Sequence, residues 1–317
     1  MDVATLRAQA IDWASDCPLT TLAFAVLGAG WLSSYVLSFA RMIRDLARPG
    51  IPLKRFGANK GAWAVVTGAT AGIGRDFALQ LAGAGFNIFL ASRTASKLDA
   101  IAQEITAKYP SVETQVHAID FSSPSADYAA LKAALDPLDV GVLINNVGKS
   151  YEEPTFFQDL SDQDMTDIVE INVNATMKVT KLVIPGMISR KRGLILTVGS
   201  FASLIPSPLL AVYSGSKAFL STWSQALGSE LKGTGVEVEL LNTYFVVSKL
   251  SKIRKSSWMI PTPKTYVRSV LSHIGWVVDH LFSRQFWLDY NRKLHLDIRK
   301  RVLRKREREA AKAVKGE

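Results

Sequence analysis

A tyrosine and a lysine four residues apart, with a serine thirteen residues upstream, are the side chains best suited to chemistry. Tyr213 and Lys217 stand in the pattern Tyr-x-x-x-Lys, and Ser200 precedes them. Residues four apart on a helix share one face, so we expect the Lys217 ammonium beside the Tyr213 phenol. A phenol ordinarily titrates near pH ~10. Because a neighbouring positive charge stabilises the phenolate, we expect Lys217 to lower the pKa of Tyr213 and make it an acid or base near neutrality.

The Tyr-x-x-x-Lys pattern is common by chance, and on its own it also fits an exposed pair on a helix surface. A glycine-rich turn favours a site instead. Residues 67–74 read Thr-Gly-Ala-Thr-Ala-Gly-Ile-Gly, with an apolar strand before them and a helix after them. Backbone N–H groups of such a turn and the N-terminus of the following helix bind a pyrophosphate. The spacing is G-x-x-x-G-x-G rather than G-x-G-x-x-G, and it is the placement between a strand and a helix that favours a bound dinucleotide.

The end of the second predicted strand indicates which dinucleotide binds. An NAD site there usually offers a carboxylate to the ribose 2′-hydroxyl. This chain has Ser92 and Arg93 at that point and no acid. Because a guanidinium binds phosphate with two parallel hydrogen bonds, Arg93 predicts the 2′-phosphate of NADP(H). A solvated arginine is the alternative.

Short apolar segments alternate with longer helical segments from Trp63 onward. Apolar segments with little alternation are typical of strands covered on both faces. Repeated strand–helix units predict an α/β domain with a doubly wound parallel sheet of the Rossmann type and helices on both sides. The predicted strands cover residues 64–66, 87–91, 112–119, 140–144, 194–198 and 236–241. Predicted helices run from the glycine turn to about residue 83 and over residues 97–109.

Taken together, these features resemble the short-chain dehydrogenase/reductase family over roughly residues 61–250. The signatures of that family occur in order: the glycine turn, Asp120, Asn145-Asn146-Val147-Gly148, Asn172, Ser200, Tyr213 and Lys217. Two departures stand out. Val147 occupies a position where the family more often has alanine, and residues 242–248 replace the usual Pro-Gly turn after the last strand.

The resemblance implies a role for each signature residue. Tyr213 protonates the carbonyl oxygen of a substrate whose carbon receives hydride, and Ser200 hydrogen-bonds the same oxygen. Two hydroxyl donors on one oxygen stabilise the alkoxide that develops there. Lys217 holds the ribose hydroxyls, and Asn172 positions a water in the proton relay, with a helix cap or bend as its alternative role. The residues expected to contact NADPH are Gly68, Thr70, Gly72, Ile73, Gly74, Arg93, Asp120, Asn146, Tyr213, Lys217, Val246 and Ser248.

Within the family the chain is most similar to the microsomal very-long-chain 3-oxoacyl-CoA reductases. The resemblance rests on an N-terminal apolar segment, Asn-Asn-Val-Gly at 145–148, Ile-Pro-Gly-Met at 184–187 and the basic residues 249–255. It implies NADPH-dependent reduction of long-chain 3-oxoacyl-CoA in fatty-acid elongation, with other elongation enzymes as partners. The basic residues fit an anionic CoA, and a solvated or lipid-facing charge run is their alternative. A reductase of 17-ketosteroids or other lipophilic ketones and a non-catalytic elongation subunit stay open as functions.

Residues 17–40 form an uncharged run of 24. As a helix this run is about 36 Å long at ~1.5 Å per residue, enough to cross a hydrocarbon core of ~30 Å. A cleaved signal peptide is the alternative, but the preceding residues carry three aspartates against Arg7 alone. Six basic residues and one acid follow in 41–60, which predicts a single-pass anchor with a cytosolic catalytic domain. The family resemblance implies the endoplasmic reticulum membrane.

Charge and composition describe the remaining parts. The net charge is +10, and residues 292–317 hold eleven Lys/Arg against four Asp/Glu. We interpret this tail as a contact with anionic lipid rather than nucleic acid, since no nucleic-acid-binding module accompanies it. One cysteine and four histidines give little support for a metal site.

The apolar and polar pattern of residues 266–290 predicts an amphipathic helix that closes the pocket or lies at the membrane interface. The predicted division is a lumenal N-terminus (1–16), an anchor (17–40), a basic linker (41–60), an NADP(H)-binding reductase domain (61–262) and an amphipathic helix with a basic tail (263–317).

Overall fold

A computed structural model describes residues 2–47, 49–248, 250–257, 259–275, 297, 300–304 and 306–307. Residues up to 49 and residues 50–275 belong to two separate compact units, which are described in turn. Lys249 and the predicted amphipathic segment beyond residue 275 lie outside the described residues. The predicted division of the chain stays a prediction.

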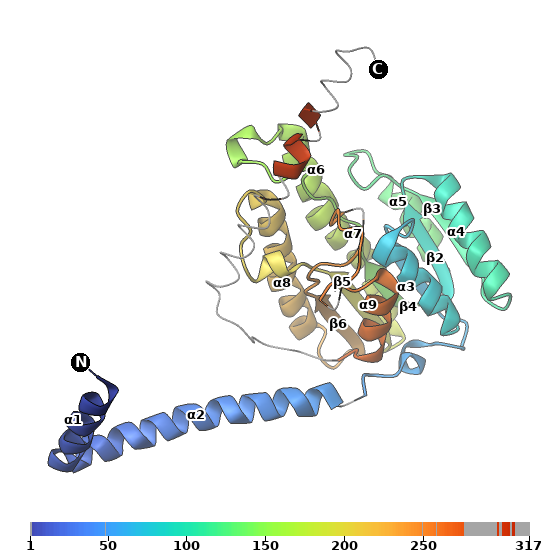
Figure 1. Ribbon diagram of the computed structural model, residues 1–317. Coiled ribbons are helices and arrows are strands. Elements are labelled where there is room, and N and C mark those ends of the chain that lie inside the picture. Colours follow the sequence, from blue (N-terminus) through green and yellow to red (C-terminus); the bar gives the residue numbers. More distant parts are fainter. Residues whose placement is uncertain are drawn as a thin grey trace. The chain divides into compact units, whose positions relative to one another are not determined.

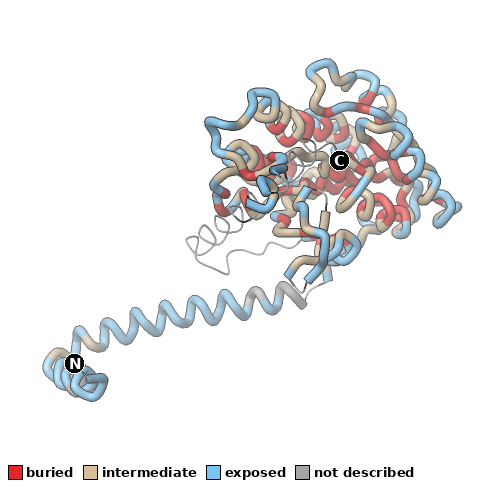
Figure 2. Tube along the Cα trace, turned by 45° about the horizontal axis from the view of Figure 1, so that its top comes forward, coloured by how far each residue is buried: buried red, intermediate tan, exposed pale blue. Residues whose placement is uncertain are grey.

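The N-terminal unit consists of two helices, α1 (Val3–Asp16) and α2 (Pro18–Ala47). Helix α1 was not predicted from the sequence, and the Asp2 side chain caps it by accepting hydrogen bonds from the backbone N–H groups of Ala4 and Thr5. Pro18 starts α2, where its fixed φ and missing N–H cost nothing. The stretch Pro18–Ala40 is apolar and long enough to cross a membrane. The large apolar residues of this stretch are exposed, which is compatible with a membrane anchor (Figure 2).

A six-stranded parallel sheet with the order β3-β2-β1-β4-β5-β6 forms the centre of the second unit (Figure 1). The strand order reverses between β1 and β4, so the carboxyl ends of these strands border the crevice in which such sheets bind ligands. This confirms the predicted doubly wound sheet. The strands are β1 (Trp63–Thr67), β2 (Asn87–Ser92), β3 (Thr114–Ala118), β4 (Val140–Asn145), β5 (Gly193–Val198) and β6 (Val236–Leu241).

Helices cover both faces of the sheet, and each face has its own apolar core. On one face α3 (Gly72–Gly83), α4 (Ala95–Lys108) and α9 (Pro263–Ser272) pack around a cluster that includes Phe77, Leu98 and Val267. On the other face α5 (Tyr128–Leu135), α7 (Ala175–Ser189) and α8 (Ala211–Glu230) pack on a cluster that includes Leu131 and Val183. Apolar residues of the central strands are buried on both sides, which is why their sequence shows little alternation.

A π-helical turn joins α6 (Asp162–Val169) to α7. It spans Glu170–Asn174 and contains Asn172, whose side chain is fully buried. A π turn adds one residue to a helical turn, and such turns are rare and frequently occur at functional sites. This irregularity turns Asn172 toward the loop after β4.

Candidate active site

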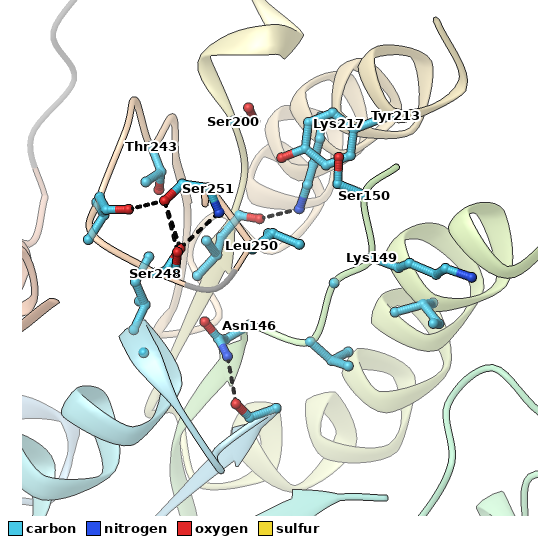
Figure 3. Close-up of a pocket in the computed structure, with 18 of the residues that line it drawn as sticks. Asn146, Lys149, Ser150, Ser200, Tyr213, Lys217, Thr243, Ser248, Leu250 and Ser251 are labelled. Atoms are coloured by element: carbon cyan, nitrogen blue, oxygen red, sulfur yellow. Dashed lines mark hydrogen bonds between the residues drawn. The ribbon is translucent and has the colours of Figure 1, made fainter. Parts of the chain in front are cut away.

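A cavity of about 970 Å³ lies at the carboxyl ends of the strands (Figure 3). Its walls are the glycine turn, the loops that follow β2 to β6, and the first turns of α8. Most of the site residues predicted from the sequence line it: Gly68, Thr70, Gly72, Ile73, Arg93, Asp120, Asn146, Ser200, Tyr213, Lys217, Val246 and Ser248. The other two, Gly74 and Asn172, lie behind the wall.

Glycines shape the turn between β1 and α3. Gly68 and Gly72 have positive φ angles of 64° and 57°, which favour glycine. A Cβ on Gly74 would come closer than 3.0 Å to the Gly68 carbonyl oxygen and to the side chain of Asn146. Ala71, before α3, offers no side-chain cap, so the backbone N–H groups of the first helical turn are open to the cavity. This is the arrangement in which a helix N-terminus binds phosphate.

Asn146 holds this turn in place. Its Nδ2 donates to the carbonyl oxygens of Thr67 at 2.9 Å and Gly68 at 3.1 Å, and its backbone N–H donates to Thr67 Oγ1 at 3.0 Å. Both amide hydrogens are therefore used within the protein. The predicted contact of Asn146 with the nucleotide stays a prediction. Thr67 was not among the predicted site residues, although it opens the glycine turn.

Arg93 and Asp120 line the cavity after β2 and β3. Arg93 is exposed and makes no ion pair within the described part of the chain. Asp120 Oδ1 accepts hydrogen bonds from the hydroxyl of Ser122 at 2.7 Å and from its backbone N–H at 3.0 Å. These bonds hold the pKa of Asp120 below its ordinary value, and the charge of Arg93 acts in the same direction. A guanidinium and a carboxylate thus stand where the adenosine end of a dinucleotide is expected.

Lys217 is a buried amine with unused hydrogen-bonding capacity. Its side chain is 4% exposed, and Nζ donates to the Val198 carbonyl oxygen at 2.8 Å. It makes no ion pair with any described carboxylate, so its remaining hydrogens face the cavity without a protein acceptor. Burial lowers the pKa of Lys217 to about 8.

Tyr213 and Ser200 line the cavity next to Lys217 (Figure 3). Burial raises the pKa of Tyr213, and the nearby Ser200 hydroxyl offsets this only in part. The expected lowering of this pKa by Lys217 is not found, and the pKa of Tyr213 lies above its ordinary value. The ammonium lies 5.9 Å from the centre of the Tyr213 ring and is turned toward Val198 instead of the phenol. Tyr213 is accordingly protonated at neutral pH.

Asn172 ties the π turn to the loop after β4. Its Nδ2 donates to the Lys149 carbonyl oxygen at 2.9 Å and to Ser216 Oγ at 3.0 Å, while its Oδ1 accepts from the Lys149 N–H at 2.8 Å. Only acceptor capacity on Oδ1 is left for a water, so the predicted relay role stays a prediction. Lys149 Nζ in turn binds Asp164 at 2.9 Å and Asp167 at 2.6 Å on α6.

The loop after β6 is organised by hydroxyl groups. Ser251 Oγ donates to the Val246 carbonyl oxygen at 2.6 Å, and Ser251 N–H donates to Ser248 Oγ at 3.1 Å. Thr243 Oγ1 lies 2.5 Å from the hydroxyl of Tyr266 on α9. Neither Ser251 nor Tyr266 was predicted, because their partners are set by the folded loop. Of the basic residues expected to contact CoA, Lys252 lines the cavity, and Arg254 and Lys255 are exposed.

Comparison with known proteins identifies the family. Residues 62–257 match the model for short chain dehydrogenases. The chain belongs to this family. A very-long-chain 3-oxoacyl-CoA reductase of Coprinopsis cinerea is 53% identical over 85% of this chain and 86% of its own length. A relative of the same name from Laccaria bicolor is 48% identical over 98% and 99%, respectively.

Solved structures of short-chain dehydrogenases share the fold. An actinorhodin polyketide ketoreductase determined with NADPH is 27% identical, has a TM-score of 0.60, and aligns with 68% of this chain and 91% of its own. As a short-chain dehydrogenase, this protein is an oxidoreductase that uses a nicotinamide cofactor.

The residues of the cavity fit such a cofactor. The uncapped N-terminus of α3 provides backbone donors for a pyrophosphate. Gly72 leaves room beside the turn, since a Cβ there would meet only Ser248 at 3.7 Å. The free hydrogens of Lys217 suit ribose hydroxyls, and Arg93 suits a phosphate.

Proposed function

We propose that this short-chain dehydrogenase reduces very-long-chain 3-oxoacyl-CoA to 3-hydroxyacyl-CoA with NADPH, as a step of fatty-acid elongation. The proposal rests on one observation: the hydroxyls of Ser200 and Tyr213, the buried Lys217 and the open N-terminus of α3 border the same cavity. The names of the Coprinopsis cinerea and Laccaria bicolor relatives support the acyl-CoA substrate.

The proposed chemistry assigns proton transfer to Tyr213. A bound nicotinamide cofactor supplies a hydride equivalent to the ketone carbon. Because burial raises the pKa of Tyr213, the phenol carries its proton at neutral pH and can donate it to the ketone oxygen. Ser200 hydrogen-bonds the same oxygen and stabilises its developing negative charge. Lys217 holds the ribose hydroxyls, and its charge stabilises the phenolate that remains after proton transfer.

NADPH is the proposed form of the cofactor. Arg93 follows β2, where a carboxylate would favour NAD, and it has no ion-pair partner within the described residues. A free guanidinium binds a 2′-phosphate with charge-assisted hydrogen bonds. The Ser122 hydrogen bonds keep the nearby Asp120 ionised, and we assign its carboxylate to the adenine.

The remaining walls of the cavity suit an acyl-CoA. Phe201, Tyr244 and Phe245 form a chain of edge-to-face aromatic contacts, with ring centres 5.4 and 4.7 Å apart. Such a wall packs against an apolar acyl chain. Lys252 at the cavity and the exposed Arg254 provide positive charge for the phosphates of CoA.

The test is a substrate panel with the full-length protein in detergent. NADPH oxidation is followed with 3-oxoacyl-CoAs of increasing chain length and with a 17-ketosteroid. We expect turnover of the acyl-CoAs that increases with chain length, and a steroid rate at least tenfold lower. A steroid rate above that of every acyl-CoA would assign the protein to steroid or other ketone reduction. Absence of any NADPH-dependent turnover would favour a non-catalytic elongation subunit.

We further propose a location in the endoplasmic reticulum membrane, with α2 as the single anchor and the catalytic unit in the cytosol, beside other elongation enzymes. The exposed apolar surface of α2 and the basic residues that follow it support this proposal. Protease added to sealed microsomes is expected to digest an epitope after Glu317 and to spare one before Met1. Protection of the C-terminal epitope would contradict this orientation.

A further inference from the structure

Ser150, on the loop after β4, carries a hydroxyl that the proposed proton transfer does not use. It lines the cavity together with Ser200, Tyr213 and Lys217. In Figure 3 its side chain points into the cavity on the side of Tyr213 and Lys217. Within the described part of the chain, its Oγ has no hydrogen-bond partner. The hydroxyl of the next residue, Tyr151, is bound to the Val212 N–H, and that of Thr243, across the cavity, to Tyr266.

Both neighbours of Ser150 are fixed, so its position is rigid. On one side, Asn172 binds the backbone N–H and carbonyl of Lys149, and the Lys149 ammonium binds two aspartates of α6. On the other side, Tyr151 is 7% exposed, and its hydroxyl accepts from the N–H of Val212, the residue before Tyr213. Because the backbone is held on both sides of Ser150, its side chain starts from a fixed position, and this lowers the entropic cost of a hydrogen bond to substrate.

A 3-oxoacyl thioester has a second carbonyl, one methylene away from the ketone. When Ser200 and Tyr213 bind the ketone oxygen, this thioester oxygen needs its own donor on the same wall. We infer that the Ser150 hydroxyl donates a hydrogen bond to the thioester carbonyl oxygen and thereby selects 3-oxoacyl thioesters over simple ketones. The inference rests on the proposed function and adds the residue that recognises the second carbonyl.

The experiment compares two substrates in four proteins. One substrate is a long-chain 3-oxoacyl-CoA, and the other is the matching CoA thioether, in which a methylene replaces the thioester carbonyl and the ketone is kept. The proteins are the full-length wild type, Ser150→Ala, Ser150→Thr and Ser207→Ala. Ser207 is the matched control, because it lines the same cavity from the loop after β5 and its hydroxyl also has no partner among the described residues.

We expect Ser150→Ala to lower kcat/KM for the thioester by about tenfold, the effect of one lost hydrogen bond, and to change it less than twofold for the thioether. Ser150→Thr keeps a hydroxyl and is expected to recover at least half of the loss. Ser207→Ala is expected to stay within twofold of the wild type on both substrates. If no variant turns over the thioether, its inhibition constants against the thioester give the same comparison, with equal values expected for wild type and Ser150→Ala.

Equal losses on both substrates would mean that Ser150 acts on the ketone or on the fold, and would overturn the inference. So would an unchanged thioester rate in Ser150→Ala, or a larger loss in Ser207→Ala. A wild type that reduces no 3-oxoacyl-CoA would instead refute the proposed function, and this inference with it. Unchanged NADPH affinity in Ser150→Ala, measured by fluorescence of the bound nucleotide, separates substrate recognition from cofactor binding.

Discussion

The glycine turn and the loop after β6 face each other across one cavity, yet they are built differently. In residues 67–74 the backbone itself forms the binding surface. The side-chain amide of Asn146 hydrogen-bonds to this backbone, and there is no room for a Cβ at Gly74. In residues 242–248 and 250–253 the backbone is held by hydroxyl side chains, with Ser251 at the centre and Tyr266 on α9 as an outer support. The first surface therefore depends on the absence of side chains, whereas the second depends on particular hydroxyl groups.

This difference matches what each side has to recognise. A dinucleotide presents the same pyrophosphate to every enzyme that binds it, so a backbone cradle with glycine at fixed points serves all of them. Substrates differ, and loops carried by a rigid scaffold adapt to them through their side chains. The departures of this chain from the common family pattern, Val147 and residues 242–248, lie on the loops after β4 and β6 and not on the glycine turn.

The largest effect is expected where the two sides meet, at Tyr213. Tyr213→Phe removes the proton donor and should lower kcat by at least ~10²-fold, while the dissociation constant of NADPH changes less than threefold. The matched control is Tyr151→Phe, which removes another hydroxyl at the cavity and one hydrogen bond from the Val212 N–H. We expect this control to lose less than tenfold. A Tyr213→Phe rate within a few-fold of the wild type would contradict the assigned role.

Gly74→Ala tests whether the glycine turn is as intolerant as its geometry indicates. The added Cβ must displace the Gly68 carbonyl or the Asn146 amide, and both shape the pyrophosphate site. NADPH affinity should fall by roughly 30- to 100-fold, with the protein still folded. Gly215→Ala is the control, since a Cβ there meets nothing within 4 Å, on the face of α8 opposite Tyr213 and Lys217. Equal NADPH affinity in the two variants would show that the turn is less constrained than proposed.

Arg93→Ala tests recognition of the 2′-phosphate, the group that NADPH has and NADH lacks. Loss of a charge-assisted phosphate contact of about 1.5–3 kcal/mol should lower kcat/KM for NADPH by roughly 10- to 100-fold. The value for NADH, which has no 2′-phosphate, should change less than twofold and serves as the internal control. Equal efficiency of wild type with NADH and NADPH would argue against the assignment of Arg93.

The smallest effect is expected for Glu239 on β6, the strand that leads into the substrate loop, and it concerns the unfolding free energy. Burial raises the pKa of Glu239 to about 7, although its Oε1 accepts a hydrogen bond from the Gly275 N–H at 2.5 Å. The folded state therefore binds a proton more tightly than the unfolded state between pH ~4.5 and ~7, and the unfolding free energy falls as pH rises through this window. Glu239→Gln removes the penalty and should stabilise the protein at pH 8 by about 1–2 kcal/mol, with little change at pH 4.5.

Thermal unfolding of the purified protein in detergent at the two pH values measures this effect. Glu113→Gln is the control, because Glu113 is exposed and its charge is not among those that act on Glu239. Its effect is expected to stay within about 0.5 kcal/mol at both pH values. A Glu239→Gln protein that is equally stabilised at pH 4.5 and pH 8 would show that desolvated charge is not the cause.

Local patterns predicted the sheet and most of the cavity wall, because buried strands, a glycine turn and helical spacing leave their mark on adjacent residues. The sequence could not show the π turn that places Asn172, nor the free hydroxyl of Ser150, since both depend on contacts between distant segments. The pKa of Tyr213 was expected to fall and instead rises. The spacing of Tyr213 and Lys217 predicted that the two side chains share one helix face. The direction of the ammonium and the burial of the phenol depend on contacts with other segments.

The most direct test of the account follows the hydrogen that reaches the substrate. Full-length wild-type protein is incubated with a long-chain 3-oxoacyl-CoA and with NADPH deuterated on one or the other face of the nicotinamide ring, and the product is analysed by mass spectrometry. We expect 3-hydroxyacyl-CoA with one deuterium on the hydroxyl-bearing carbon from one labelled form, and unlabelled product from the other. Unlabelled product from both forms, or no 3-hydroxyacyl-CoA at all, would contradict it.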